Sequence, residues 1–277
     1  MSPDERGRRP PRVVHVAEVE WLTPGMVRLV LGGDGLEGFE AGEFTDHYVK
    51  LQLPPPGAGY APPFDAVALR ETEPREHWPR TRTFTVRAWD AAERRLTLDL
   101  VVHGDDGIAG PWAARAEPGD PVQLVGPGGA YAPDPDVPTH LFVGDESALP
   151  AIAVSLERIP AGSAALVVIQ VRSPRHALEL QSAAKLELNW LLGHDEDAVL
   201  DAVRPLDFAA GATQAFVHGE ASMVRAVRRH LLVERGLPLE RLSASGYWKR
   251  GRTDEGWRQE KPEWKRLVEA DLASAGP

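Results

Sequence analysis

The sequence contains no cysteine among its 277 residues. Without thiols the chain can form no disulfide, thiolate metal site, iron–sulfur cluster or cysteine nucleophile, so a bound organic cofactor must carry any redox chemistry. The 9 histidines are scattered, with no H-E-x-x-H or paired spacing. We therefore expect no resident metal site.

Long apolar runs and an excess of positive charge are also missing. No run approaches the roughly 20 apolar residues that cross a membrane, and the opening MSPDERGRRPPR carries no apolar segment of a signal peptide. We therefore expect a cytoplasmic protein. The formal net charge of −10 disfavours nucleic acid as a partner, although the late segment GYWKRGRTDEGWRQEKPEWKR mixes cations with aromatics.

The first half of the chain has the alternation and turn signals of short strands. These patterns predict strands at 13–21, 26–32, 46–53, 80–90 and 96–104 and a short one in AEPGDPVQLVGPGG. Six short strands favour a six-stranded antiparallel Greek-key barrel.

From about residue 136 strands alternate with helices. The expected strands are THLFVGD, the nearly all-apolar AALVVIQV, KLELNWL, TQAFVHG and RLSASGY. Helices are expected at 147–159, capped by Ser147, at 196–204 and 220–235, and in the terminal KPEWKRLVEADLAS. The pattern predicts a doubly wound α/β domain with a C-terminal helix and a ligand at the carboxyl ends of its strands. We expect domains at 12–135 and 136–277.

The strand RTRTFTVRAWD raises a question about two cations. Alternation puts Arg80 and Arg82 on the same face as Phe84 and Val86. One interpretation is an edge strand whose arginines reach solvent around two apolar residues. The other is that the guanidinium groups face an anionic ligand such as a diphosphate.

Several motifs in the chain resemble those of known protein families and favour the second interpretation, an anionic ligand. The segment at 82–85, Arg-Thr-Phe-Thr, is similar to the Arg-x-Tyr/Phe-Ser/Thr signature of the ferredoxin-NADP reductase superfamily. Over about residues 12–258 the chain resembles the siderophore-interacting protein family, through VVHGDDGIAGPWAARAEPGD, VGPGG, FVGDESALPAI, NWL, AFVHGEASMVRAVRRHL and GYWKRGRTDEGW. Members are FAD-dependent, NAD(P)H-consuming ferric-siderophore reductases.

The resemblance implies a FAD site. Arg82 would bind the pyrophosphate, Phe84 would stack on the isoalloxazine, and Thr85 would donate a hydrogen bond near flavin N5. The remaining implied FAD contacts are Val86, His103, Gly104, Gly107 and Gly110. His103 could instead be a strand-end histidine bonded to backbone. Gly110-Pro111 departs from the family's usual GPAS order, and Gly128 stands where many members carry Arg.

A nicotinamide site is also implied. Its residues are Gly144, Asp145, Glu146, Ser147, Gly219 and Glu220, with Arg172 and Arg175 placed to suit a 2′-phosphate. Tyr247 and Trp248 are further expected cofactor contacts. NADPH is therefore expected, with NADH possible. Two plainer readings stay open: both arginines are surface charges, and Glu220 is a helix-start carboxylate.

For the substrate, the resemblance places Lys50 and Lys249 around the flavin edge, where cations attract an anionic ferric siderophore such as a catecholate complex. Together with Thr85 they are the expected catalytic residues. Lys50 could equally be an outward lysine on a sheet edge. Two other functions stay open: a flavoreductase for ferredoxin, quinone or free flavin, and a protein that binds ferric siderophore without reducing it. We expect a monomer.

Overall fold

The computed structural model describes residues 10–104 and 107–273. The chain divides into two compact units, Met1–Ala130 and Tyr131–Pro277. Each unit has its own hydrophobic core, made in the first by side chains inside a β-barrel and in the second by side chains between a sheet and its helices. The two units are described separately below.

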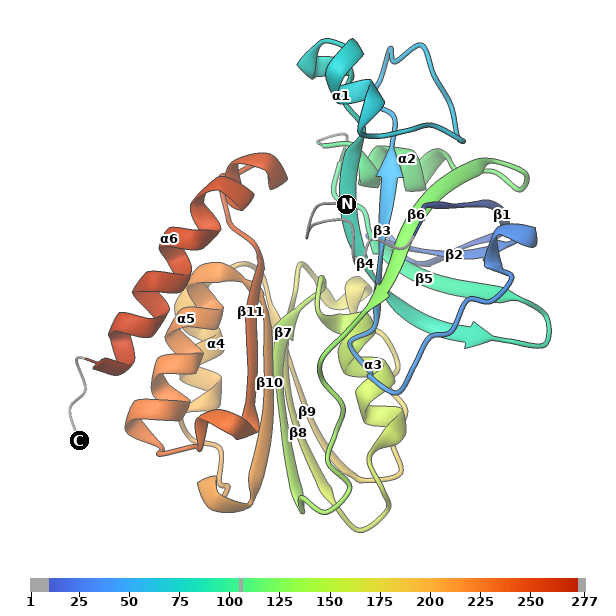
Figure 1. Cartoon of the computed structure of the whole chain (residues 1–277). Helices are drawn as coiled ribbons and strands as arrows, with labels where there is room; N and C mark the ends of the chain where they lie inside the picture. The colour runs from blue at the N-terminus through green and yellow to red at the C-terminus, as the bar shows by residue number, and fades with distance from the viewer. Residues whose placement is uncertain (1–9, 105–106, 274–277) are drawn as a thin grey trace, which may run out of the picture. The chain divides into compact units, whose positions relative to one another are not determined.

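The first unit is a closed antiparallel barrel (Figure 1). Its strands are β1 (Arg12–Thr23), β2 (Met26–Gly32), β3 (Tyr48–Leu53), β4 (Arg80–Asp90), β5 (Arg95–Val101) and β6 (Pro121–Gly128). They are hydrogen-bonded in the order β1-β2-β5-β4-β3-β6, with β6 returning to β1. The prediction of a six-stranded antiparallel Greek-key barrel is confirmed. Two short helices, α1 (Ala68–Thr72) and α2 (Ala109–Arg115), lie in its connections.

Strict alternation of side chains explains the barrel's core. On β5, Leu96, Leu98 and Leu100 are fully buried because every second side chain points inward. Strand β4 follows the same rule up to Val86, where the register with β5 shifts before Ala88. Such a bulge bends the strand and changes which side chains face inward.

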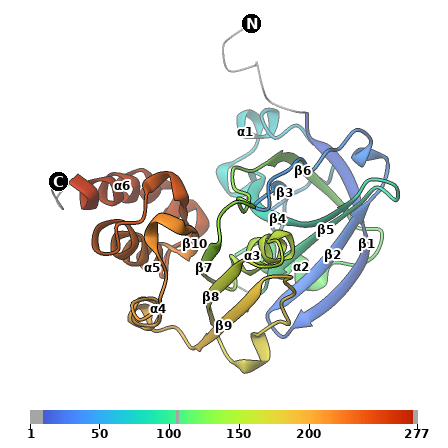
Figure 2. The same cartoon turned by 90° about the horizontal axis from the view of Figure 1, so that it is seen from below.

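The second unit is a parallel sheet with helices on both faces (Figures 1 and 2). Its strands are β7 (Thr139–Asp145), β8 (Ala164–Val171), β9 (Lys185–Leu192), β10 (Thr213–Glu220) and β11 (Leu242–Trp248), in the order β11-β10-β7-β8-β9. Helix α3 (Leu149–Arg158) covers one face; α4 (Glu196–Val203), α5 (Ala221–Arg229) and α6 (Asp254–Ala273) lie on the other. The predicted doubly wound domain is confirmed. Its strand order reverses between β7 and β10, where such domains bind ligands.

The start of α3 differs from the sequence expectation. Ala148 occupies the N-cap position and makes no side-chain capping bond, while Pro150 sits in the first turn. The amide and hydroxyl of Ser147 both donate to Asp145 Oδ1, at 2.8 and 2.5 Å. The prediction that Ser147 caps the helix was wrong, because a buried carboxylate two residues earlier takes its hydrogen bonds.

Helix α6 begins earlier than expected and is fixed against α5. It starts at Asp254, so Pro262 lies inside the helix rather than in its first turn. Trp257 and Trp264 are only 2% and 8% exposed, and Trp264 Nε1 donates to the Ala221 carbonyl at 3.0 Å. Nearer its end, Asp271 accepts two bonds from Arg225, at 2.6 and 2.7 Å. None of the described helices is long and apolar enough to cross a membrane.

Replacing Trp264 by Ala should cost about 3 to 5 kcal/mol of unfolding free energy, since a buried indole and its hydrogen bond are both lost. Urea unfolding measures this change. The control is Leu267→Ala on the same helix, whose side chain is 40% exposed and whose loss should cost less than about 1 kcal/mol. Equal losses in the two variants would show that α6 is not held by Trp264.

Candidate functional site

The pairing of β4 with β3 answers the question raised by its arginines. Arg80, Arg82 and Phe84 lie opposite Leu53, Leu51 and Val49, all three of which are buried in the barrel core. Directly opposed residues of an antiparallel pair share a face, so the predicted common face of the two arginines and Phe84 is confirmed.

The two guanidinium groups are only half-buried at this face. Arg80 Nη2 approaches the Arg75 carbonyl at 3.5 Å, and Arg82 Nη1 donates to the Thr81 carbonyl at 3.0 Å. Each guanidinium thus has a neutral backbone carbonyl as a neighbour. A guanidinium has five N–H donors and is suited to charge-assisted hydrogen bonds with an anion.

The side chains of β4 become more buried from Phe84 to Val86. Phe84 is half-buried and packs against the barrel core, Thr85 is 9% exposed, and Val86 belongs to the core. The Val86 amide donates to the His47 carbonyl at 2.7 Å. The expected FAD contacts Arg82, Phe84, Thr85 and Val86 therefore lie on one hydrogen-bonded strand, which suits precise placement of a flat ligand.

Lys50 and Gly128 lie beside this strand. Lys50 is exposed, pairs with Thr83, and holds its Nζ 5.7 Å from the centre of the Tyr48 ring. A Cβ added at Gly128 would lie 2.5 Å from Tyr48 Cζ. The phenol ring of Tyr48 therefore lies against Gly128, and a larger side chain at 128 would require this ring to move.

The glycine-rich turn after β5 carries the other expected FAD residues. Gly104 and Gly107 have φ values of +60° and +79°, in the left-handed region that favours glycine. An added Cβ would meet no atom within 4 Å at either position, so space lies open there. Residues 105 and 106 between them lie outside the described part of the chain. His103 comes just before this turn, and Gly110 lies in the first turn of α2.

In the second unit a buried carboxylate connects three strand ends. Asp145, at the end of β7, accepts from the Ser147 amide and hydroxyl, from the Glu220 amide at 2.7 Å, and from Trp248 Nε1 at 2.8 Å. Burial raises the pKa of Asp145, whereas these hydrogen bonds act in the opposite direction. Asp145 thus shapes the strand ends where a dinucleotide is expected.

Gly219 and Glu220 complete this arrangement at the end of β10. Gly219 has a φ of +138°, and a Cβ there would lie 2.6 Å from Asp145 Oδ2, so only glycine fits. Glu220 caps α5: its Oε2 accepts the amides of Ser222 and Met223, at 2.5 and 3.0 Å. The Glu220 carboxylate therefore caps the start of α5, which is one of the two interpretations that the sequence left open.

The two arginines after β8 differ in their surroundings. Arg172 forms an ion pair with Glu146 at 2.7 Å, so these two expected nicotinamide contacts bond to each other. Arg175 is exposed, and no hydrogen bond or ion pair involves its side chain in the described residues. Of the two, Arg175 has the guanidinium that a 2′-phosphate can reach without breaking an ion pair.

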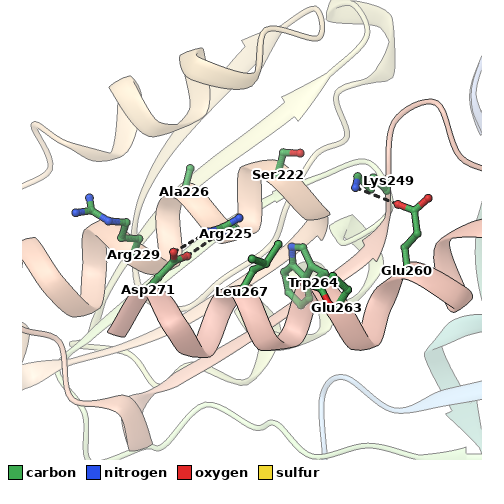
Figure 3. A pocket seen from close by; sticks show the side chains of 10 residues that line it. All are labelled: Ser222, Arg225, Ala226, Arg229, Lys249, Glu260, Glu263, Trp264, Leu267 and Asp271. Atoms are coloured by element: carbon green, nitrogen blue, oxygen red, sulfur yellow. Dashed lines mark hydrogen bonds and ion pairs between the residues drawn. The ribbon is translucent and has the colours of Figure 1, made fainter. Parts of the chain in front are cut away.

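Lys249 lies at a pocket of 660 Å³ between α5 and α6 (Figure 3). Its Nζ is 3.1 Å from Glu260 Oε2. The pocket is lined by Ser222, Arg225, Ala226, Arg229, Lys249, Glu260, Glu263, Trp264, Leu267 and Asp271. Of the neighbouring expected residues, Tyr247 lies against His218, with ring centres 5.0 Å apart, and Trp248 is 37% exposed.

The structure thus brings the expected residues into separate groups. In the barrel, the expected residues on β4 lie beside Lys50. In the α/β unit, Asp145 accepts hydrogen bonds from Ser147, Glu220 and Trp248. Glu146 forms an ion pair with Arg172. Sequence reasoning missed Tyr48 and Glu260. Nothing in a single sequence signals either one, because each acts on a partner in another element.

No group of three or more His, Cys, Asp or Glu side chains that could hold a metal occurs in residues 10–104 and 107–273. The architecture, an antiparallel barrel followed by a doubly wound parallel domain, is a ferredoxin reductase-like fold. A ferredoxin reductase of carbazole 1,9a-dioxygenase shares this fold at a TM-score of 0.63, with 17% identity over 86% of this chain and 70% of that chain.

Two family models define the chain more closely. The siderophore-interacting FAD-binding domain matches residues 15–131, and the siderophore-interacting protein model matches residues 137–251. The chain belongs to the siderophore-interacting protein family and contains its FAD-binding domain.

Relatives and solved structures agree with this assignment. The ferric vibriobactin reductase ViuB of Vibrio cholerae is 30% identical, over 91% of this chain and 94% of its own length. The NADPH-dependent ferric-chelate reductase of Escherichia coli K12 is 31% identical, over 86% of this chain and 92% of its own. The siderophore-interacting protein SipS from Aeromonas hydrophila aligns with a TM-score of 0.81 and 26% identity, covering 94% of this chain and 99% of its own.

His218 generates a prediction about pH. It is buried on β10, stacks on Phe216 with ring centres 3.8 Å apart, and bonds Ser243 Oγ through Nε2 at 2.9 Å. Burial, with the charge of Lys261, lowers the pKa of His218 from 6.5 to about 3. Between these values only the unfolded chain takes up the proton, so unfolding free energy should fall as the pH is lowered.

His218→Asn should flatten this dependence between pH 6.5 and 4, by up to about 1.4 kcal/mol per pH unit. Urea unfolding at several pH values measures the slope. His194→Asn is the control, because this imidazole is exposed. An unchanged slope in His218→Asn would contradict the assignment.

Proposed function

We propose that this chain is a FAD-dependent NAD(P)H oxidoreductase that reduces Fe(III) in siderophore complexes and releases Fe(II) in the cytoplasm, acting as a monomer. The observation that carries the proposal is β4 of the family's FAD-binding domain, where Arg82 shares a face with Phe84 and precedes the buried Thr85. The names of the ferric reductases from Vibrio cholerae and Escherichia coli support the substrate class.

The residues fit FAD chemically. Arg82 supplies a cation for a diphosphate, and the half-buried Phe84 supplies an aromatic surface for a flat ring. Left-handed backbone with open space at Gly104 and Gly107 lets amide groups approach an anion. Bound there by Arg82, Phe84 and the glycine turn, a FAD would supply the two-electron to one-electron redox chemistry that links a nicotinamide to ferric iron.

The chain's own residues have simple tasks in this proposal. Arg82 holds the diphosphate, Thr85 donates a hydrogen bond from a nearly buried position, and Lys50 and Lys249 attract an anionic chelate. Asp145, Gly219 and Trp248 shape the strand ends where the nicotinamide docks. No general acid or base is needed for electron transfer to iron.

Steady-state assay of the FAD-loaded protein tests the proposal. Under anaerobic conditions with a ferric siderophore and a ferrous-specific chelator, each NADPH oxidised should yield two trapped Fe(II), because a hydride carries two electrons. NADPH oxidation that needs a quinone or ferredoxin instead would favour a different acceptor. Chelate binding with no NADPH oxidation would favour a binding protein.

Arg175 should select NADPH over NADH. Arg175→Ala is expected to raise the KM for NADPH about ten-fold, with the KM for NADH unchanged, since only NADPH carries the 2′-phosphate. Steady-state kinetics with both dinucleotides give the comparison. The control is Arg158→Ala, an exposed arginine on α3. Equal effects on NADPH and NADH would mean that Arg175 is a surface charge.

A further inference from the structure

One carboxylate on the C-terminal helix neutralises part of the positive charge around Lys249. Glu260 Oε2 bonds Lys249 Nζ at 3.1 Å, and Glu260 Oε1 accepts from Arg252 Nε. Hydrogen bonds from Arg252 and Lys249 lower the pKa of Glu260, so the carboxylate is ionised at neutral pH. Two cations therefore share one anion.

The position of Glu260 is set by the docking of α6. Trp257 and Trp264, one turn before and one turn after it, are buried against α5 and the sheet. Lys261, the next residue, donates to the Gly246 carbonyl at 2.8 Å. Figure 3 shows Glu260 extending from α6 toward Lys249. The negative charge is thus presented by a fixed helix, not by a mobile segment.

This arrangement changes the charge that a ligand of Lys249 meets. Lys249 and Arg252 contribute two positive charges and Glu260 one negative, leaving a net charge of +1 for the three groups. A multiply charged anion that binds Lys249 is attracted by two cations and repelled by the Glu260 carboxylate. The carboxylate therefore weakens its binding in proportion to the negative charge of the anion. A neutral complex loses almost nothing.

We propose that Glu260 is a specificity-determining residue, which weakens the attraction of the site for strongly anionic tris-catecholates and so narrows their advantage over ferric chelates of low or zero net charge, such as neutral ferric trihydroxamates. The inference rests on the proposed reductase function and on Lys249 contacting the substrate. It refines the expectation of a catecholate substrate, for which a fully cationic site would be the better match.

The test compares Glu260→Gln with the wild-type protein on one anionic and one neutral substrate. The variant should lower the KM for a ferric tris-catecholate roughly three- to ten-fold, and leave the KM for a ferric trihydroxamate and both kcat values within about two-fold. Raising the salt concentration should reduce the gain, because exposed charges are screened.

Glu263→Gln is the matched control. Glu263 lines the same pocket from α6 and pairs with Arg266, so its replacement changes the net charge equally without touching Lys249. Lys249→Met should remove most of the effect of Glu260→Gln if the carboxylate acts through this lysine. Because the Glu260 side chain is about one-third exposed and its ion pairs are partly solvated, the variant should unfold within about 1 kcal/mol of the wild type.

The outcomes separate the two proposals. If the wild type reduces iron and Glu260→Gln shows the same substrate preference as Glu263→Gln, the specificity role is overturned and the reductase function stands. If no variant reduces either complex, the reductase function fails. Binding of the two complexes, followed by quenching of tryptophan fluorescence, then still decides whether Glu260 disfavours the anionic one.

Discussion

The α/β unit depends on one buried carboxylate. Asp145 accepts hydrogen bonds from the loop after β7, from the end of β10 and from the end of β11, and so ties three parallel strands together at their carboxyl ends. A buried carboxylate is costly unless such donors satisfy it. The requirement for glycine at 219 follows from it, because any side chain there would collide with this carboxylate. The hydrogen bonds of this one carboxylate thus fix the edge of the sheet that would dock a nicotinamide.

In the barrel unit the corresponding constraint is the register of β4. Pairing with β3 places two cations and an aromatic ring on the face of the barrel core, where a strand would ordinarily carry only apolar side chains. The ring of Tyr48 lies against Gly128, which carries no side chain. With Glu260 beside Lys249, this chain holds less positive charge near its expected substrate residues than the sequence suggested.

Much of the fold could be predicted from the sequence, because it rests on local patterns. Alternation on 96–102 and the apolar run at 164–171 gave strands whose burial the structure confirms. The side-chain partners could not be predicted. Trp248 bonds Asp145 across 103 residues. The Ser147 cap failed because the Ser147 hydroxyl donates to Asp145 instead of accepting from the helix amides. Glu260 lies 11 residues from Lys249, and only the docking of α6 brings them together.

The most direct test of the account is an anaerobic absorption spectrum of the FAD-loaded protein, recorded before and after one equivalent of NADPH and again after a ferric siderophore with a ferrous trap. The account predicts that the flavin absorbance bleaches with NADPH and returns on addition of the complex, with about two Fe(II) trapped per flavin. A protein that stays colourless after incubation with FAD, or a reduced flavin that persists in the presence of the ferric complex, would contradict it.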